Sequence, residues 1–85
     1  SWGVETSKKF TKDEIESILS KLTDEEKYGI ILRAKGIVAG EGSWIHYDYI
    51  PGESDVREGG ADVIGRICVI GSKINEKALS ELFGI

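Results

Sequence analysis

The chain has 85 residues, of which 40% are hydrophobic and 31% are charged, and its formal net charge is −4. A chain of this length has room for one hydrophobic core, and no apolar run approaches the ~18 residues that span a bilayer. The acidic balance argues against general nucleic-acid binding, which requires clustered lysines and arginines. Because Cys68 is the only cysteine, an internal disulfide is excluded, and we expect a cytoplasmic protein without membrane or nucleic-acid partners.

The first residues predict a short strand followed by a helix. Trp2, Val4 and Thr6 alternate with small or charged residues, a pattern typical of a strand. Thr11 and Glu14 have the spacing of a capping box, in which each side chain bonds the backbone of the other at a helix start. The apolar residues that follow recur at helical spacing and predict an amphipathic helix, with Ile15, Ile18, Leu19 and Leu22 on its buried face.

The most β-rich stretch is Ile30–Gly40, which follows one possible helical turn over residues 23–28. Strict alternation there predicts one purely apolar face and one face that also carries two cations. The expected apolar face consists of Ile30, Leu32, Ala34, Gly36 and Val38, and the opposite face of Ile31, Arg33, Lys35 and Ile37.

A glycine-bearing connection at residues 41–43 leads into a second strand, Trp44–Ile50, so these two strands should form a β-hairpin. Alternation assigns the residues of this second strand to two faces. One face should carry Ile45, Tyr47 and Tyr49, and the other Trp44, His46, Asp48 and Ile50.

The C-terminal third combines a polar segment, a strand and a helix. Pro51–Ile64 contains the only proline and several acidic residues, which predicts an exposed, mobile arm. Gly65–Gly71 reads as a short strand, with Ile67 and Val69 facing away from Arg66, Cys68 and Ile70. Asn75 should cap a closing helix whose buried face holds Ala78, Leu79, Leu82 and Phe83.

The expected order of elements is therefore βαβββα. Two helices with one apolar stripe each can cover only one face of a four-stranded sheet. We predict an α+β two-layer sandwich with a mostly antiparallel sheet, both helices on one face and the other face open.

Two motifs then indicate a family. Leu32-Arg33-Ala34-Lys35-Gly36 fits a central strand of the form (L/V)-R-(A/S)-K-G, and the Ile67–Gly71 strand precedes a helix start marked by Ile74 and Asn75. In this order and spacing the chain resembles the C-terminal domain of the CobW family of P-loop GTPases. The resemblance covers nearly the whole chain.

The resemblance implies that residues 1–85 form a single accessory domain excised from a larger GTPase. The family is linked to cobalamin biosynthesis, zinc homeostasis and the insertion of metals into enzymes. The implied partners are the parent GTPase domain and a client metalloprotein, and the implied cofactors of the parent are GTP with Mg²⁺ and a transition metal, Zn or Co. This chain lacks the G-x-x-x-x-G-K-S/T loop that cradles phosphates, so we expect no catalytic residue, no cofactor of its own and no GTP hydrolysis by it alone.

The open sheet face is the candidate site, because exposed tryptophan and arginine are enriched at interaction hot spots. Alternation places Arg33, Lys35, Trp44, His46, Asp48, Arg66 and Cys68 on that face, and we expect protein contacts from Arg33, Lys35, Trp44, His46 and Arg66. The alternative is a solvated face whose cations pair with Asp48 and other carboxylates. Binding of an anion by Arg33 and Lys35 would lack the support of a helix N-terminus.

Two chemical alternatives involve the single cysteine. His46, Asp48 and Cys68 offer imidazole, carboxylate and thiolate ligands, so they could form a metal site if their strands are in register. The chain would then act as a metal-binding or small-ligand sensor module. Cys68 could also act as a nucleophile with His46 as its base, although a cysteine within an ICVI run is more typical of packing.

Overall fold

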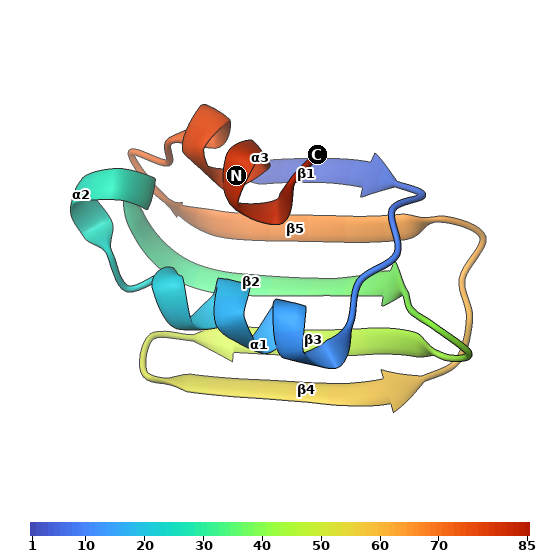
Figure 1. The fold of residues 1–85 in the computed structure, drawn as a ribbon. Helices are drawn as coiled ribbons and strands as arrows, with labels where there is room; N and C mark the ends of the chain where they lie inside the picture. The colour runs from blue at the N-terminus through green and yellow to red at the C-terminus, as the bar shows by residue number, and fades with distance from the viewer.

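The computed structural model describes all residues from Ser1 to Ile85 and consists of one sheet covered on one face by helices. The five strands are β1 (Trp2–Thr6), β2 (Ile30–Ala39), β3 (Trp44–Ile50), β4 (Glu53–Gly59) and β5 (Gly65–Ser72). Their order in the sheet is β1-β5-β2-β3-β4, and every neighbouring pair is antiparallel (Figure 1). The first two strands therefore run parallel to each other, with β5 between them.

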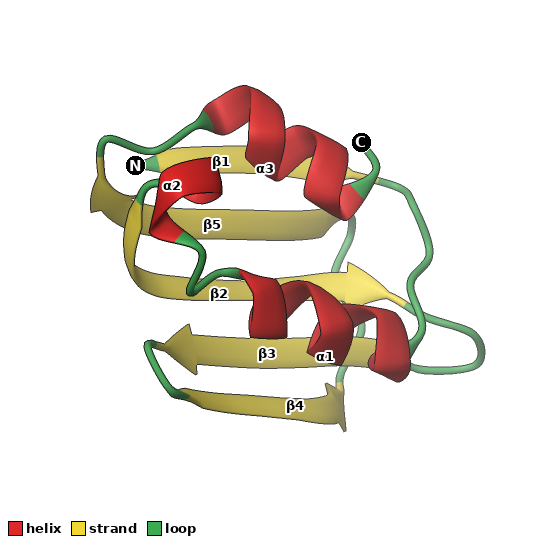
Figure 2. Cartoon of the chain, turned by 60° about the vertical axis from the view of Figure 1, so that its left-hand side comes forward, coloured by secondary structure: helices red, strands yellow, loops and turns green.

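Three helices lie on the same face of this sheet: α1 (Lys12–Lys21), α2 (Glu25–Tyr28) and α3 (Glu76–Phe83) (Figure 2). The predicted capping box is present, since the Thr11 hydroxyl accepts from the Glu14 backbone at 3.1 Å and the Glu14 carboxylate accepts from the Thr11 backbone at 2.9 Å. The Asn75 side chain caps α3 as expected. The α+β two-layer class is confirmed. None of the helices combines the length and hydrophobicity needed to cross a membrane.

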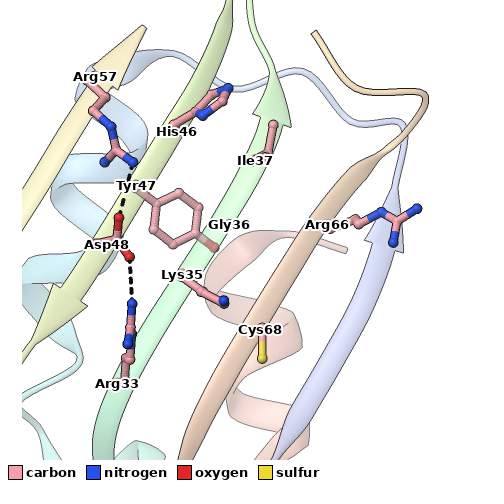
Figure 3. Close-up of a pocket in the computed structure, with 10 residues that line it drawn as sticks. All are labelled: Arg33, Lys35, Gly36, Ile37, His46, Tyr47, Asp48, Arg57, Arg66 and Cys68. Carbon is pink, nitrogen blue, oxygen red and sulfur yellow. Dashed lines mark hydrogen bonds and ion pairs between the residues drawn. The ribbon is translucent and has the colours of Figure 1, made fainter. Parts of the chain in front are cut away.

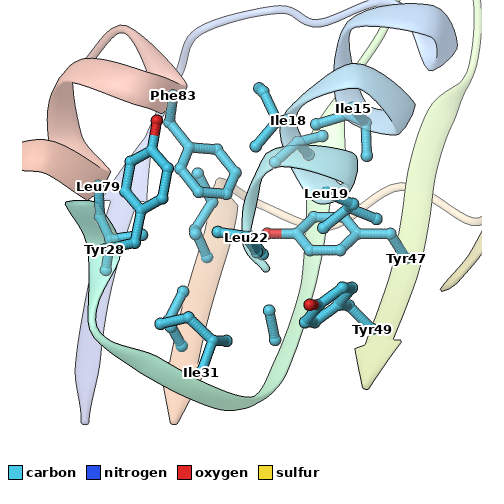
Figure 4. Packing of buried hydrophobic residues seen from close by; sticks show 14 of the residues in the cluster. Ile15, Ile18, Leu19, Leu22, Tyr28, Ile31, Tyr47, Tyr49, Leu79 and Phe83 are labelled. Atoms are coloured by element: carbon cyan, nitrogen blue, oxygen red, sulfur yellow. The ribbon is translucent and has the colours of Figure 1, made fainter. Parts of the chain in front are cut away.

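The core lies between the two layers and contains 18 buried hydrophobic residues (Figure 4). The sheet contributes Ile45, Tyr47 and Tyr49 from β3, and Ile67 and Val69 from β5, as alternation predicted. Because their neighbours in sequence point the other way, the polar residues of these strands stay on the face without helices.

The prediction of an exposed, mobile arm over residues 51–64 is wrong in part. Residues 53–59 within it form the edge strand β4, which pairs with β3 along its whole length, so the sheet has five strands rather than four. Only Val56 of this strand is partly buried, and its other residues are exposed. The strand was missed because a charged edge strand lacks the apolar alternation by which strands are recognised, although such charges are what discourages edge-to-edge association.

The second correction concerns the start of β2. The pairing of β2 with β5 shifts register between Ile31 and Arg33, so Leu32 is an extra residue in a β-bulge. As a result Ile31 is buried, whereas Ile30 and Leu32 are 42% and 57% exposed, the reverse of the predicted faces. Beyond the bulge, Ala34 and Val38 are buried as predicted.

Candidate functional site

The face of the sheet opposite the helices carries two rows of mostly polar residues across neighbouring strands (Figure 3). Strand register fixes the members of each row. The first row consists of Cys68, Lys35, Asp48 and Asp55, and the second of Arg66, Ile37, His46 and Arg57.

These rows line a shallow depression of about 440 Å³, which we call the basic hollow. Its charged lining consists of four cations, Arg33, Lys35, Arg57 and Arg66, and a single carboxylate, Asp48, with His46 and Cys68 also at its surface. The hollow thus has a positive excess, although the chain as a whole has a net charge of −4. A surface of this kind favours an acidic ligand or partner.

Asp48 is the acidic centre of the hollow. One of its oxygens lies 3.2 Å from the Arg33 guanidinium, and the other lies 3.2 Å from that of Arg57. Partial desolvation alone would raise the pKa of Asp48, but hydrogen bonds and charge from these two arginines outweigh it and lower the pKa. Arg57 also binds Asp55 at 2.7 Å, so it is the most fully neutralised of the four cations.

The lowered pKa of Asp48 predicts a contribution to acid stability. Above its ordinary pKa of 3.8 the carboxylate is charged in both states but has the two arginines only when folded, so its stabilising effect is fully present there. The effect is lost as pH falls through the lower folded pKa. We expect Asp48→Asn to flatten the fall in stability below about pH 4, measured by urea unfolding across pH.

A matched variant distinguishes the contribution of the Asp48 ion pairs to stability from the effect of removing any one carboxylate. Glu16 is an exposed carboxylate of α1 with no salt bridge. Glu16→Gln should retain the full acid dependence of the unmodified chain. A profile in Asp48→Asn that is as steep as in Glu16→Gln would mean that the Asp48 ion pairs add nothing to stability, as many exposed pairs do not.

The remaining two cations of the hollow are weakly neutralised or unpaired. Arg66 lies 3.8 Å from Glu5 and 3.9 Å from Asp62, at the outer limit for a salt bridge. Lys35 is exposed, and its ammonium group makes no salt bridge or hydrogen bond within the chain. It projects into the middle of the hollow between Asp48 and Cys68 (Figure 3). Lys35 is therefore the cation of the hollow most available to an external partner.

The structure places most, but not all, of the predicted interaction residues together. Arg33, Lys35, His46 and Arg66 all line the hollow. Trp44 lies on the same face but pairs with Gly59 and Ala39 at the end of the sheet, outside the lining. Sequence reasoning missed Arg57 because it belongs to the segment read as an arm. The alternation of Asp55 and Arg57 around Val56 was the available signal.

The structure does not bring together His46, Asp48 and Cys68, the residues of the alternative metal site. Cys68 and Asp48 pair with Lys35 from opposite sides, so a whole strand separates them, a distance of about 9 to 10 Å between their backbones. No three His, Cys, Asp or Glu side chains come close enough to bind one metal ion. The same separation argues against the pairing of Cys68 with His46, whose Nε2 instead lies 2.8 Å from the Gly60 carbonyl.

The topology and the open face define a two-layer antiparallel α+β domain whose uncovered sheet surface is polar and locally basic. The family model described as "Cobalamin synthesis protein cobW C-terminal domain" matches residues 1–84. The chain belongs to this family, as its LRAKG strand and its closing strand and helix had indicated.

Two solved structures have the same fold. The Zn(II)-bound YjiA GTPase from E. coli superposes with a TM-score of 0.77 at 17% identity, and a Zn(II)-bound triple mutant of YjiA superposes with a TM-score of 0.74 at 17% identity. Each match covers 98% of this chain but only 28% of the solved chain. No curated protein matches the sequence. The chain thus spans about a quarter of the length of the structures that it resembles.

Proposed function

We propose that this chain is a non-catalytic accessory domain of a metal-handling GTPase, and that its open sheet face docks onto a protein. The family supports the accessory role, because the family model describes the C-terminal domain of a cobalamin synthesis protein. The solved GTPases with the same fold are Zn(II)-bound, and this chain covers only 28% of their length. On this proposal the rest of the parent binds GTP with Mg²⁺ and handles Zn or Co, in keeping with a link to cobalamin synthesis or metal insertion.

The observation that carries the docking role is the uncovered basic hollow. Its four cations all lie on strands of the sheet, and Lys35 has no partner within the chain. Trp44 lies at the end of the same face and is only partly buried. Arginine and tryptophan are enriched among residues that dominate binding energy at interfaces. The parent GTPase domain and a client metalloprotein are the two proposed partners.

The first test is the sequence of the complete open reading frame. A Walker-type phosphate loop and a C-x-C-C motif upstream of this segment would agree with the proposal. A complete gene of 85 residues, or an unrelated upstream domain, would overturn the GTPase assignment and leave only the fold and family.

Docking itself is tested with two substitutions on the open face. We expect Trp44→Ala and Arg33→Glu each to weaken binding to the GTPase domain, or to the client, by about tenfold or more, because each removes a side chain typical of hot spots. Isothermal titration calorimetry between separately expressed partners measures the loss. Arg33→Glu affects only an exposed ion pair with Asp48, so little stability should be lost.

Lys21→Glu on α1 provides the control, since it makes a similar charge reversal on the helix layer. Its affinity should stay close to that of the unmodified domain. If all three variants bind both partners equally well, the open face is not the docking surface.

A further inference from the structure

An exposed aliphatic cluster lies on the open face at the end of the sheet where β2 begins. It consists of Ile30, Leu32, Ile50 and Ile70, whose exposed fractions are 42%, 57%, 47% and 42%. Register brings them together, because Ile70 pairs with Arg33, and Ile50 follows the pair between Tyr49 and Ala34. We call these four residues the aliphatic end.

The β-bulge is what creates the aliphatic end. In a strand without this bulge, strict alternation would turn Ile30 and Leu32 toward the helices. The register shift between Ile31 and Arg33 instead buries Ile31 and leaves the other two side chains exposed. Bulges redirect side chains in this way and are frequent next to functional sites. Grouped exposed aliphatic residues are also a feature of binding surfaces rather than of ordinary solvated faces.

The aliphatic end and the basic hollow form one continuous surface. Arg33 belongs to the hollow and pairs directly with Ile70 of the aliphatic end. Leu32 and Lys35 are three residues apart on β2, or about 10 Å at ~3.3 Å per residue. A single partner segment can therefore contact both regions at once.

The charges limit which partner fits. Four cations and one carboxylate line the hollow, whereas the chain as a whole carries a net charge of −4. Asp55, Glu5 and Asp62 pair with Arg57 or Arg66 from outside the lining, so Lys35 is the cation left without a partner. An acidic segment would be repelled by most of the molecule and attracted only here, which gives both selectivity and orientation. An inorganic anion would satisfy Lys35 but would leave the four aliphatic side chains uncovered.

We propose that the open face binds an acidic, aliphatic peptide segment of a partner protein. Aliphatic side chains of the segment pack against Leu32 and its neighbours in the aliphatic end, and a carboxylate pairs with the Lys35 ammonium group. This inference rests on the proposed docking role and adds the chemistry of the partner. The recognised feature is one segment that carries both kinds of side chain, rather than a folded acidic surface or a free anion.

The test uses the 85-residue chain and synthetic amphipathic peptides of about four helical turns. The first peptide carries a leucine stripe flanked by glutamates; a second has serine in place of leucine, and a third has lysine in place of glutamate. Calorimetry measures affinity, and NMR shifts of backbone amides locate the contact. We expect only the first peptide to bind with shifts on the open face.

Two variants and two matched controls test the assigned residues. Lys35→Glu should weaken binding by about tenfold or more, and Leu32→Ser by about fivefold. Lys77→Glu on α3 makes the same charge reversal on an exposed residue of the opposite layer, and Val63→Ser removes an aliphatic side chain that is 95% exposed. Both controls should stay within about twofold of the unmodified affinity.

Several results would overturn the inference. Equal losses in Lys35→Glu and Lys77→Glu would show general charge attraction, and equal binding of the serine peptide would show that the aliphatic end is not used. Displacement of the peptide by millimolar inorganic phosphate at constant ionic strength would assign the hollow to small anions. Dimerisation lost in Leu32→Ser, measured by sedimentation, would assign the aliphatic end to a second copy of the chain.

The experiments distinguish a failure of the acidic-segment inference from a failure of the proposed docking role. If no peptide binds, but Trp44→Ala and Arg33→Glu still weaken binding to the GTPase domain or client, docking stands and the acidic segment fails. If the peptide binds through Lys35 and those two variants leave both partners unaffected, the segment stands and the proposed GTPase-linked docking fails.

Discussion

Replacing Gly36 by alanine is expected to destabilise the domain by about 1 to 3 kcal/mol, because the sheet has no room for a side chain at this position. A Cβ atom there would lie 2.6 Å from the Arg66 carbonyl oxygen and 2.6 Å from the Tyr47 hydroxyl. Gly36 pairs with Tyr47 across the strands, and the tyrosine ring occupies the space that a side chain would need. Urea unfolding of the two proteins measures the difference.

Whether alanine at position 36 lowers or raises stability shows whether a side chain fits there. Where alanine fits, a change from glycine usually stabilises a protein by about 0.4 to 1 kcal/mol, because it restricts the unfolded chain. Gly60 is the matched control, since a Cβ atom there would meet nothing within 4 Å. Gly60→Ala should be neutral or slightly stabilising. If Gly36→Ala behaved like Gly60→Ala, the close packing of Tyr47 on β2 would be wrong.

The Tyr47 hydroxyl offers a second check on this packing. It is buried without a hydrogen-bond partner. Burial, and to a smaller extent the neighbouring Cys68, raises the pKa of Tyr47, so the phenol stays neutral at ordinary pH. Because an unpaired buried hydroxyl is costly, Tyr47→Phe should be neutral or stabilising, and it should relieve part of the cost of Gly36→Ala.

The parts of the fold that sequence patterns predicted are those that depend on nearby residues. The Thr11 and Glu14 capping box needs only a spacing of three, and the two faces of β3 need only alternation along one strand. These features do not depend on which strand lies next to which. They were accordingly predicted with the correct residues.

The features that were missed depend on pairing between distant segments. The β-bulge at Leu32 lies where β2 pairs with β5. The Ile30 backbone approaches Gly71 so closely there that no side chain would fit at position 71. Nothing within the residues of β2 alone indicates an extra residue. The edge strand β4 was missed for another reason: it buries only part of Val56, and pairing with β3 rather than apolar burial holds it in place.

The same distinction holds for the candidate site. Arg33, Lys35, His46 and Arg66 could be assigned to the open face because alternation fixes their side. The metal hypothesis requires Cys68 and Asp48 to be neighbours, and only the strand order reveals that β2 lies between their strands. Where a strand has no bulge, alternation therefore predicts on which side of the sheet a residue lies, but it does not predict which residues on that side are neighbours.

Phe83→Ala should have the largest effect on stability, a loss of about 3 to 5 kcal/mol from the 5 to 15 kcal/mol typical of a domain. Phe83 is 1% exposed, its ring meets that of Phe10 edge-on at 6.4 Å, and it lies 6.0 Å from that of Trp2. Truncation leaves a cavity where α3, β1 and the segment before α1 meet. The melting temperature should fall by at least about 12 °C, and Phe83→Leu should cost clearly less because it fills most of that space.

Comparison of Phe83→Ala with Lys35→Glu tests whether the helix side of the sheet provides stability while the open side provides binding. Phe83 lies on the helix side and Lys35 on the open side, with no shared contact, so their effects should be independent. Phe83→Ala should lower stability while each folded molecule still binds the acidic peptide with unchanged affinity. Lys35→Glu should do the reverse, losing affinity at nearly constant stability. If folded Phe83→Ala bound the acidic peptide more weakly, core packing on the helix side would influence the binding surface on the open side, and the two effects would not be independent.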